Sequence, residues 1–138
     1  MQTEILNKTL QNRSINPTAM RLLVLDKLMN AEVALSLADL EIEMDQADRI
    51  TIYRTLKTFE ENKLIHSIED GTGSIKYAHC ESSCKCTPEF THAHFHCNNC
   101  NQTFCLRNIH LPEINLPKNF EVEQSSFILK GICDQCKS

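Results

Sequence analysis

The sequence lacks long hydrophobic runs and a start that resembles a signal peptide. Runs such as RLLVL at 21–25 end after a few residues, whereas a membrane-spanning helix needs about 20 apolar residues. Residues 1–13, MQTEILNKTLQNR, mix polar and apolar side chains and have no apolar core of the kind that a secretory signal needs. We therefore expect a soluble, cytoplasmic protein with no membrane segment. Its 138 residues, 41% of them hydrophobic, are enough for a buried core.

An excess of positive charge is also lacking. The net charge of −4 has the wrong sign for a protein that coats phosphate backbones nonspecifically. A sequence-specific DNA-binding protein needs only one locally basic face. The charge therefore argues against strong nonspecific binding and leaves specific binding open.

Cysteine is absent from residues 1–79, and all eight cysteines lie at or after Cys80. In a reducing compartment such a group predicts metal binding rather than a disulfide framework. The sharp change in composition predicts an ordinary first domain followed by a metal-dependent second domain.

Three segments of the first domain have helical spacing. The first follows Asn16 and Pro17, which suit a cap and a first-turn proline, and the second begins at Ser36, a good N-cap. Their apolar positions, with those of a third segment at 48–64, are Met20, Leu23, Val24 and Leu28, then Leu37, Leu40 and Met44, then Ile52, Leu56 and Phe59. In the third segment Tyr53, Arg54 and Lys57 project away from the apolar stripe.

A hairpin pattern follows the third helical segment. LIHSIE at 64–69 and SIKYAH at 74–79 alternate around the turn DGTG. The order of three helices and a hairpin is that of a winged helix-turn-helix. The same elements could also form a plain small core with Arg54 and Lys57 as solvated surface.

Two CxxC pairs lie in the second domain. They are Cys97 with Cys100, and Cys133 with Cys136. Each CxxC puts two sulfurs on one turn, and two such turns form a closed tetrahedral thiolate cage for structural zinc. A redox CxxC needs a strand-to-helix context that neither pair shows.

The histidines before the first pair follow strand parity. On an extended chain His92, His94 and His96 share one face, and Cys97 points to the other. After the CxxC turn, the segment QTFC at 102–105 allows Cys105 to return toward the histidines if the two strands pair.

Three segments resemble the ferric uptake regulator family of bacterial metal-dependent repressors: ITIYRTLKTFEENKLI at 50–65, GTGSIKYAH at 71–79 and HAHFHCNNC at 92–100. The likeness extends from about Pro17 to Cys136. It implies a recognition helix that enters the major groove, with Thr51, Tyr53, Arg54 and Thr55 on or near its DNA face, where Arg can contact guanine or phosphate and Tyr thymine methyl groups. It also implies DNA contact by Arg21, and further basic candidates are Lys57, Lys63 and Lys76.

The resemblance also implies a regulatory metal site. The family binds its sensed metal through histidines five and three residues before the first CxxC, which are His92 and His94 here, and often through the position that Cys105 occupies. Iron and peroxide sensors tend to have a carboxylate at that position. Zinc sensors add a linker cysteine, matched by Cys86, and the resulting S₂N₂ set favours Zn²⁺ over a harder ion.

Other ligand assignments remain open. Cys80, Cys84 or His79 could replace Cys86 or form a third site, and His96 reads as hydrogen-bonded or spare. We expect His66 and His110 to have no role. Prolines around INLP at 114–117 predict that the family's helix there is short or missing. FEVEQSSFILKGI at 120–132 reads as one or two strands, with Val122, Phe127 and Leu129 as candidates for a dimer face.

The sequence thus predicts an α+β protein, an N-terminal winged helix-turn-helix followed by a small β-rich, zinc-stapled dimerisation domain. We expect a DNA-binding domain at 1–79, a metal-binding linker at 80–91 and a dimerisation and metal-binding domain at 92–138. The predicted function is that of a homodimeric, non-enzymatic repressor of metal homeostasis genes on an inverted-repeat operator, with Zn²⁺ as structural ion and corepressor. Within the family, the chain most resembles the zinc uptake regulator branch.

Three alternatives remain from the sequence. The first is a sensor of Fe²⁺ or another divalent metal in the same family. The second is a zinc-dependent deaminase, because HCE at 79–81 before CNNC faintly matches HxE…PCxxC. The third is a zinc-stapled protein-interaction module without DNA contact.

Overall fold

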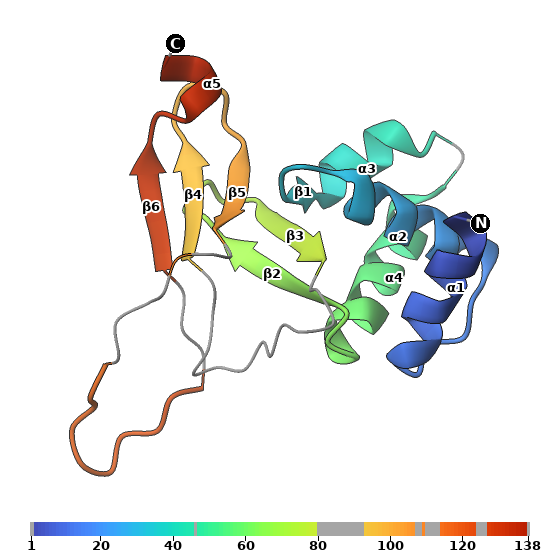
Figure 1. The fold of residues 1–138 in the computed structure, drawn as a ribbon, viewed down its shortest axis with the longest axis horizontal. Coiled ribbons are helices and arrows are strands. Elements are labelled where there is room, and N and C mark those ends of the chain that lie inside the picture. Colours follow the sequence, from blue (N-terminus) through green and yellow to red (C-terminus); the bar gives the residue numbers. More distant parts are fainter. Residues whose placement is uncertain are drawn as a thin grey trace.

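The computed structural model describes residues 2–45, 47–79, 93–106, 109, 114–123 and 127–137. Helices gather at the N-terminal end of the fold, a small sheet adjoins them, and a second sheet carries the C-terminus (Figure 1). The α+β class predicted from the sequence is confirmed. No helix in the described ranges has the length and apolar character to cross a membrane.

The N-terminal part contains four helices, which are α1 (Gln2–Asn12), α2 (Ala19–Asn30), α3 (Leu37–Glu43) and α4 (Arg49–Glu61). Their inward side chains form one hydrophobic cluster with residues of both strands of the hairpin. The predicted stripe on α4 is confirmed, since Ile52, Leu56 and Phe59 are all 0% exposed. The expected cap of α3 is also present: Ser36 and Asp39 form a capping box.

Helix α2 starts two residues later than the sequence suggested. Its N-cap is Thr18, whose hydroxyl accepts a hydrogen bond from the Arg21 amide, so Asn16 is not the cap and Pro17 precedes the helix. Leu25 is fully buried and Leu23, one of the apolar positions of the predicted helix, is 53% exposed.

Two elements were not predicted. Helix α1 buries Leu6 and Leu10, one turn apart, against the other helices. Strand β1 (Leu35–Ser36) is two residues long and pairs with β3, with Leu35 opposite Tyr77. Such a short strand has no pattern of its own, because only its tertiary partner defines it.

The predicted hairpin is confirmed. β2 (Ile65–Glu69) pairs antiparallel with β3 (Ile75–His79), and β1 completes a sheet of order β1-β3-β2. The turn contains Gly71 at φ +84° and Gly73 at φ +85°. Residues with a Cβ rarely adopt this backbone conformation.

The second sheet has the order β5-β4-β6. β4 (Ala93–Cys97) runs antiparallel to β5 (Thr103–Leu106) and parallel to β6 (Phe127–Gly131), and α5 (Asp134–Lys137) follows. Residues 114–123 contain no helix, as the prolines predicted. They contain no strand either, so Val122 lies outside the sheet, while Phe127 and Leu129 are 37% and 43% exposed on β6.

The register of α2 is testable with two leucines. We expect Leu25→Ala to lower the free energy of unfolding by about 2–5 kcal/mol, because it leaves a cavity in the core. Leu23→Ala, the matched control, should change it by less than about 0.5 kcal/mol, as most surface substitutions do. Urea denaturation monitored by circular dichroism measures both. A larger loss of stability in Leu23→Ala than in Leu25→Ala would contradict the observed register of α2.

Candidate metal centres and DNA-binding face

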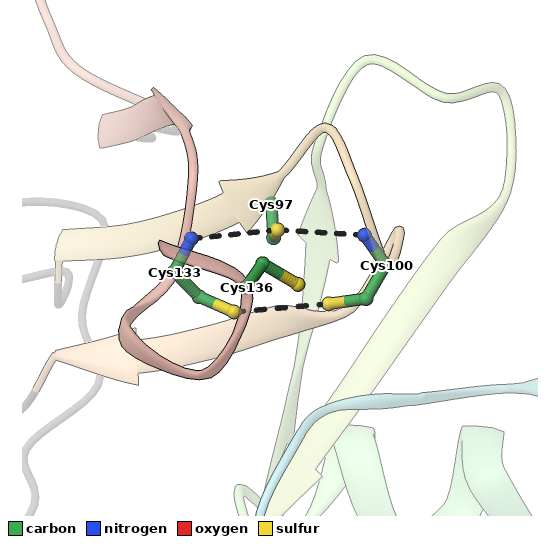
Figure 2. A group of neighbouring side chains, drawn as sticks. All are labelled: Cys97, Cys100, Cys133 and Cys136. Atoms are coloured by element: carbon green, nitrogen blue, oxygen red, sulfur yellow. Dashed lines mark hydrogen bonds between the residues drawn. The ribbon is translucent and has the colours of Figure 1, made fainter. Parts of the chain in front are cut away.

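Four cysteines meet at one end of the second sheet. Cys97 ends β4, Cys100 lies on the turn that follows, Cys133 comes just after β6, and Cys136 is in α5. Their sulfur atoms all lie within 4.8 Å of one another, and Figure 2 shows the four side chains converging from two separate turns. The parallel pairing of β4 and β6, with Cys97 opposite Gly131, brings the turns together.

Cys97 is fully buried, and its sulfur is held by the backbone of both turns. Its sulfur accepts hydrogen bonds from the backbone amides of Cys100 at 3.5 Å and Cys133 at 3.4 Å (Figure 2). These amides, that of Cys100 first, lower the pKa of Cys97 to about 6, because they stabilise the thiolate more than the thiol. The local backbone therefore prepares a ligand in its metal-binding form.

The other sulfurs show why a cation fits here. A backbone hydrogen bond from Gln102 lowers the pKa of Cys100, but partial desolvation and the neighbouring thiols outweigh it and raise the pKa to about 12. Cys100 and Cys133 are only 3.9 Å apart, sulfur to sulfur. Four thiolates at this spacing repel one another unless a cation neutralises them, and a closed S₄ set suits structural Zn²⁺.

A second cluster joins the two sheets. His66 of β2, His94 of β4 and Cys105 of β5 each place a ligand atom within 4.8 Å of the other two. The Nε2 atoms of the two histidines are 3.3 Å apart, and His94 lies directly opposite Cys105 in the β4–β5 ladder. Two imidazoles and a thiol from three strands can hold a transition-metal ion.

The structure brings together two of the four predicted regulatory ligands, His94 and Cys105. The others, Cys86 and His92, lie outside the described residues, as do Cys80, Cys84 and His110. The pairing of β4 and β5, assumed in the sequence analysis, is present. His79, an alternative ligand, lines the same cavity as Cys105, together with Glu32.

We expected no role for His66, but the structure places it with His94 and Cys105 in a group that could hold a metal ion. Strand parity puts His66 on the face of β2 that carries Ile68, opposite Ile65. Both isoleucines are 2% exposed, so both faces of β2 are covered. The signal available in the sequence was the pair of isoleucines at 65 and 68, which lie on opposite faces of a strand and indicate that the face of His66 is covered too. His96, as expected, is hydrogen-bonded, with Nδ1 3.0 Å from the Thr103 hydroxyl.

The outer face of α4 carries most of the predicted DNA contacts. Tyr53 is 43% exposed, Arg54 and Lys57 are exposed and Thr51 is half-buried. The Lys57 ammonium lies 5.5 Å from the centre of the Tyr53 ring. Its pKa is raised by nearby Glu60, 3.4 Å away, so Lys57 stays charged.

Three predicted contacts look different in the structure. Thr55 is 7% exposed and its hydroxyl donates to the Thr51 carbonyl, so it lies on the packed side of α4 and not on the exposed face that carries Tyr53 and Arg54. The Lys76 ammonium is buried 3.1 Å from the Asp70 carboxylate, which removes it from the phosphate-binding candidates. Arg21 is half-buried and donates to the Asn16 carbonyl at 2.8 Å.

The four-cysteine centre predicts a local effect of metal loss. We expect Cys136→Ser to remove one zinc per chain and to speed amide hydrogen exchange in β4, β5 and β6, because the site holds together turns far apart in the chain. Lys137→Ser, at the exposed neighbouring position, is the control and should keep the metal. Metal analysis and hydrogen exchange measure both. Full metal content in Cys136→Ser would contradict a site made of these four ligands.

A family model and several solved structures match the chain. The model described as "Ferric uptake regulator family" matches residues 12–133. No curated protein sequence matches the chain significantly. A zinc uptake regulator solved with zinc and DNA has a TM-score of 0.71 at 22% identity, with 99% of this chain and 95% of that chain covered.

Iron-related structures match as well. The Vibrio cholerae ferric uptake regulator has a TM-score of 0.63 at 17% identity, covering 92% of this chain and 98% of that one. The Francisella tularensis ferric uptake regulator with iron has a TM-score of 0.61 at 17% identity, covering 90% and 96%. At these identities the structural likeness establishes the fold alone.

Proposed function

Because the chain belongs to the ferric uptake regulator family, it is a metal-responsive DNA-binding transcriptional regulator and not an enzyme, and we propose that zinc is the metal it senses. Family membership also removes the deaminase and the interaction module from consideration. The observation that carries the proposal is the cluster of His66, His94 and Cys105.

The donor set supports zinc over iron. A thiolate is a soft ligand that suits Zn²⁺, and imidazole binds it well, whereas carboxylates suit harder ions. Cys105 stands where iron and peroxide sensors of the family tend to have a carboxylate. We propose His66, His94 and Cys105 as three ligands. The fourth comes from Cys86 or His92, with Cys80, Cys84 and His79 as alternatives.

The position of the cluster explains how metal could control DNA binding. His66 belongs to the hairpin next to α4, and His94 and Cys105 belong to the second sheet. A bound Zn²⁺ supplies one attachment point shared by these strands. The three side chains then fix α4 relative to the second sheet. The DNA-contacting helix α4 can therefore adopt fewer positions.

In a homodimer this constraint sets the distance between the α4 helices of the two protomers. Successive major grooves on one side of DNA lie about 34–36 Å apart, so a fixed separation selects an inverted repeat. A metal that binds the DNA-competent arrangement better by about 5.5 kcal/mol moves the populations from 1:99 to 99:1. We propose that the exposed side chains of Phe127 and Leu129, on the edge strand β6, contribute to the dimer interface, and that the protein acts in the cytoplasm as a repressor.

Ligand substitution tests the regulatory site. We expect wild-type chains to hold two zinc ions each, and Cys105→Ser to lose one of them while the four-cysteine site and the fold persist. Cys105→Ser and His66→Gln should each weaken zinc-dependent DNA binding at least about tenfold, and the double variant should be little worse than either, because both act through one ion. Metal analysis and fluorescence anisotropy on a duplex selected from random sequences measure these effects.

Metal competition separates zinc from iron. Zinc should activate DNA binding at a lower free concentration than Fe²⁺ under anaerobic conditions. Activation by Fe²⁺ at the lower concentration would make iron the sensed metal. DNA binding that ignores every metal would overturn the regulatory site itself.

The DNA face can be tested on neighbouring residues of α4. We expect Arg54→Ala to weaken binding to the selected duplex by about 1–3 kcal/mol at saturating zinc. Thr55→Val keeps the shape of a buried side chain and should leave the affinity unchanged. The same anisotropy assay measures both, and equal losses would place Thr55 in the interface after all.

A further inference from the structure

A buried carboxylate, that of Asp70, lies near the cluster of His66, His94 and Cys105 but is not one of its ligands. Asp70 directly follows β2, at the start of the hairpin turn, and its side chain is 0% exposed. Inside the hairpin, its Oδ1 accepts from the amide and the hydroxyl of Thr72 at 3.1 and 2.6 Å. Its Oδ2 accepts from the Lys76 ammonium at 3.1 Å.

The same carboxylate reaches the second sheet. The hydroxyl of Thr103, on β5, donates to Asp70 Oδ2 at 2.6 Å. Because that proton is directed at Asp70, the Thr103 oxygen accepts from His96 Nδ1, 3.0 Å away. Thr103 is 0% and His96 4% exposed. A chain of hydrogen bonds thus runs from β4 through β5 to the hairpin.

Asp70 is held in its charged form. Burial raises its pKa, but hydrogen bonds from Thr103, Thr72 and Lys76 outweigh burial and keep the pKa well below its usual range. A charged acceptor makes each of these hydrogen bonds stronger than a neutral one.

Other contacts bring the same parts together. The Ala34 amide, next to β1, donates to the Thr103 carbonyl at 2.8 Å, so Thr103 contacts the N-terminal part with its main chain as well. A Cβ added to Gly71 would lie 2.5 Å from the Lys130 ammonium of β6. The hairpin turn is therefore closely packed against the second sheet.

The spacing relates this contact to the metal cluster. In the β4–β5 ladder His94 pairs with Cys105, and His96 pairs with Thr103. The two pairs are two residues apart on each strand and therefore face the same side, about 7 Å from each other. On the hairpin, His66 and Asp70 are four residues apart. The hairpin thus meets one face of the β4–β5 pair at two points, and only one of them needs an ion.

We propose that Asp70 is a positioning residue for the regulatory metal site, acting through Thr103 and His96. The Asp70–Thr103–His96 contact holds the hairpin on the β4–β5 pair before metal arrives, so that His66 already lies close to His94 and Cys105. A site organised in advance binds its ligand more tightly, because less conformational freedom is lost on binding. The inference rests on the proposed function only for what the bound ion controls.

Three threonine variants of the full-length chain, each with zinc in the four-cysteine site, test the proposal with Co²⁺ as the probe. Thr103→Val is nearly isosteric and removes both hydrogen bonds of the hydroxyl. Thr103→Ser keeps the hydroxyl. Thr72→Val removes the contacts of the Thr72 hydroxyl with Asp70 and Lys76, which lie inside the hairpin, and keeps the backbone hydrogen bond to Asp70.

We expect Thr103→Val to weaken Co²⁺ binding at the second site about tenfold, in keeping with the loss of a hydrogen bond to a charged group. Its Co²⁺ absorption spectrum at saturation should match that of wild type, because the ligands are unchanged. Thr103→Ser should bind Co²⁺ like wild type, and Thr72→Val should lose less affinity than Thr103→Val.

Two results would overturn the positioning role. One is unchanged Co²⁺ affinity in Thr103→Val, and the other is a loss in Thr72→Val as large as in Thr103→Val. A loss of zinc from the four-cysteine site, or an altered Co²⁺ spectrum, would show a general structural role instead and also count against it. DNA binding is measured separately: if wild type takes up Co²⁺ but its DNA affinity ignores metal, the proposed function fails while the affinity comparison still decides the role of Asp70.

Discussion

The alternation of side chains along strand β4 determines which residues meet in both candidate metal centres. His94 and His96 point to one face, and Cys97 ends the strand on the other. The antiparallel register with β5 then puts Cys105 beside His94 and Thr103 beside His96, and the parallel register with β6 puts Cys97 near the second CxxC. A slip of one residue would exchange the faces and dismantle both metal centres at once.

Sharing a strand makes the two centres unequal. The four cysteines close a site within the second sheet and its two flanking turns, whereas His66, His94 and Cys105 form a site only when the hairpin lies against that sheet. The first centre therefore fixes the frame in which His94 is presented, and the second depends on it. A cell could vary occupancy of the second site while the first remains filled, which suits a structural role for one ion and a regulatory role for the other.

The sequence predicted local features of the site better than features that link distant segments. Strand parity anticipated the meeting of His94 with Cys105 within a short stretch, once the two strands were assumed to pair. The four-cysteine cluster links distant segments, and it was anticipated because two CxxC turns together supply the four ligands of a closed Zn²⁺ site. His66 was missed because its relation to His94 crosses the domain boundary. The cap at Thr18 was missed because Asn16 and Pro17 also suit a helix start, and the choice shifted Leu23 and Leu25 between surface and core. Thr55 was predicted as a DNA contact because it belongs to a motif of consecutive residues. On a helix, however, residues share a face only every 3.6 positions, so neighbours in the motif can point to different sides.

The buried ion pair of Asp70 and Lys76 is better explained by orientation than by stability. Taking a carboxylate and an ammonium out of water costs free energy that their attraction offsets only in part, and apolar side chains of similar size often stabilise a fold equally well. Apolar contacts, however, have no preferred direction, and a hairpin held by them alone could slide along β4–β5. Thr72 and Lys76 hold the Asp70 carboxylate in one orientation within the hairpin. The hydrogen bond from Thr103 to that carboxylate then joins the hairpin to β5, and a shift of the hairpin along β4–β5 would break it. If metal binding at the proposed second site controls the placement of α4, a directional contact of this kind next to the site has a function.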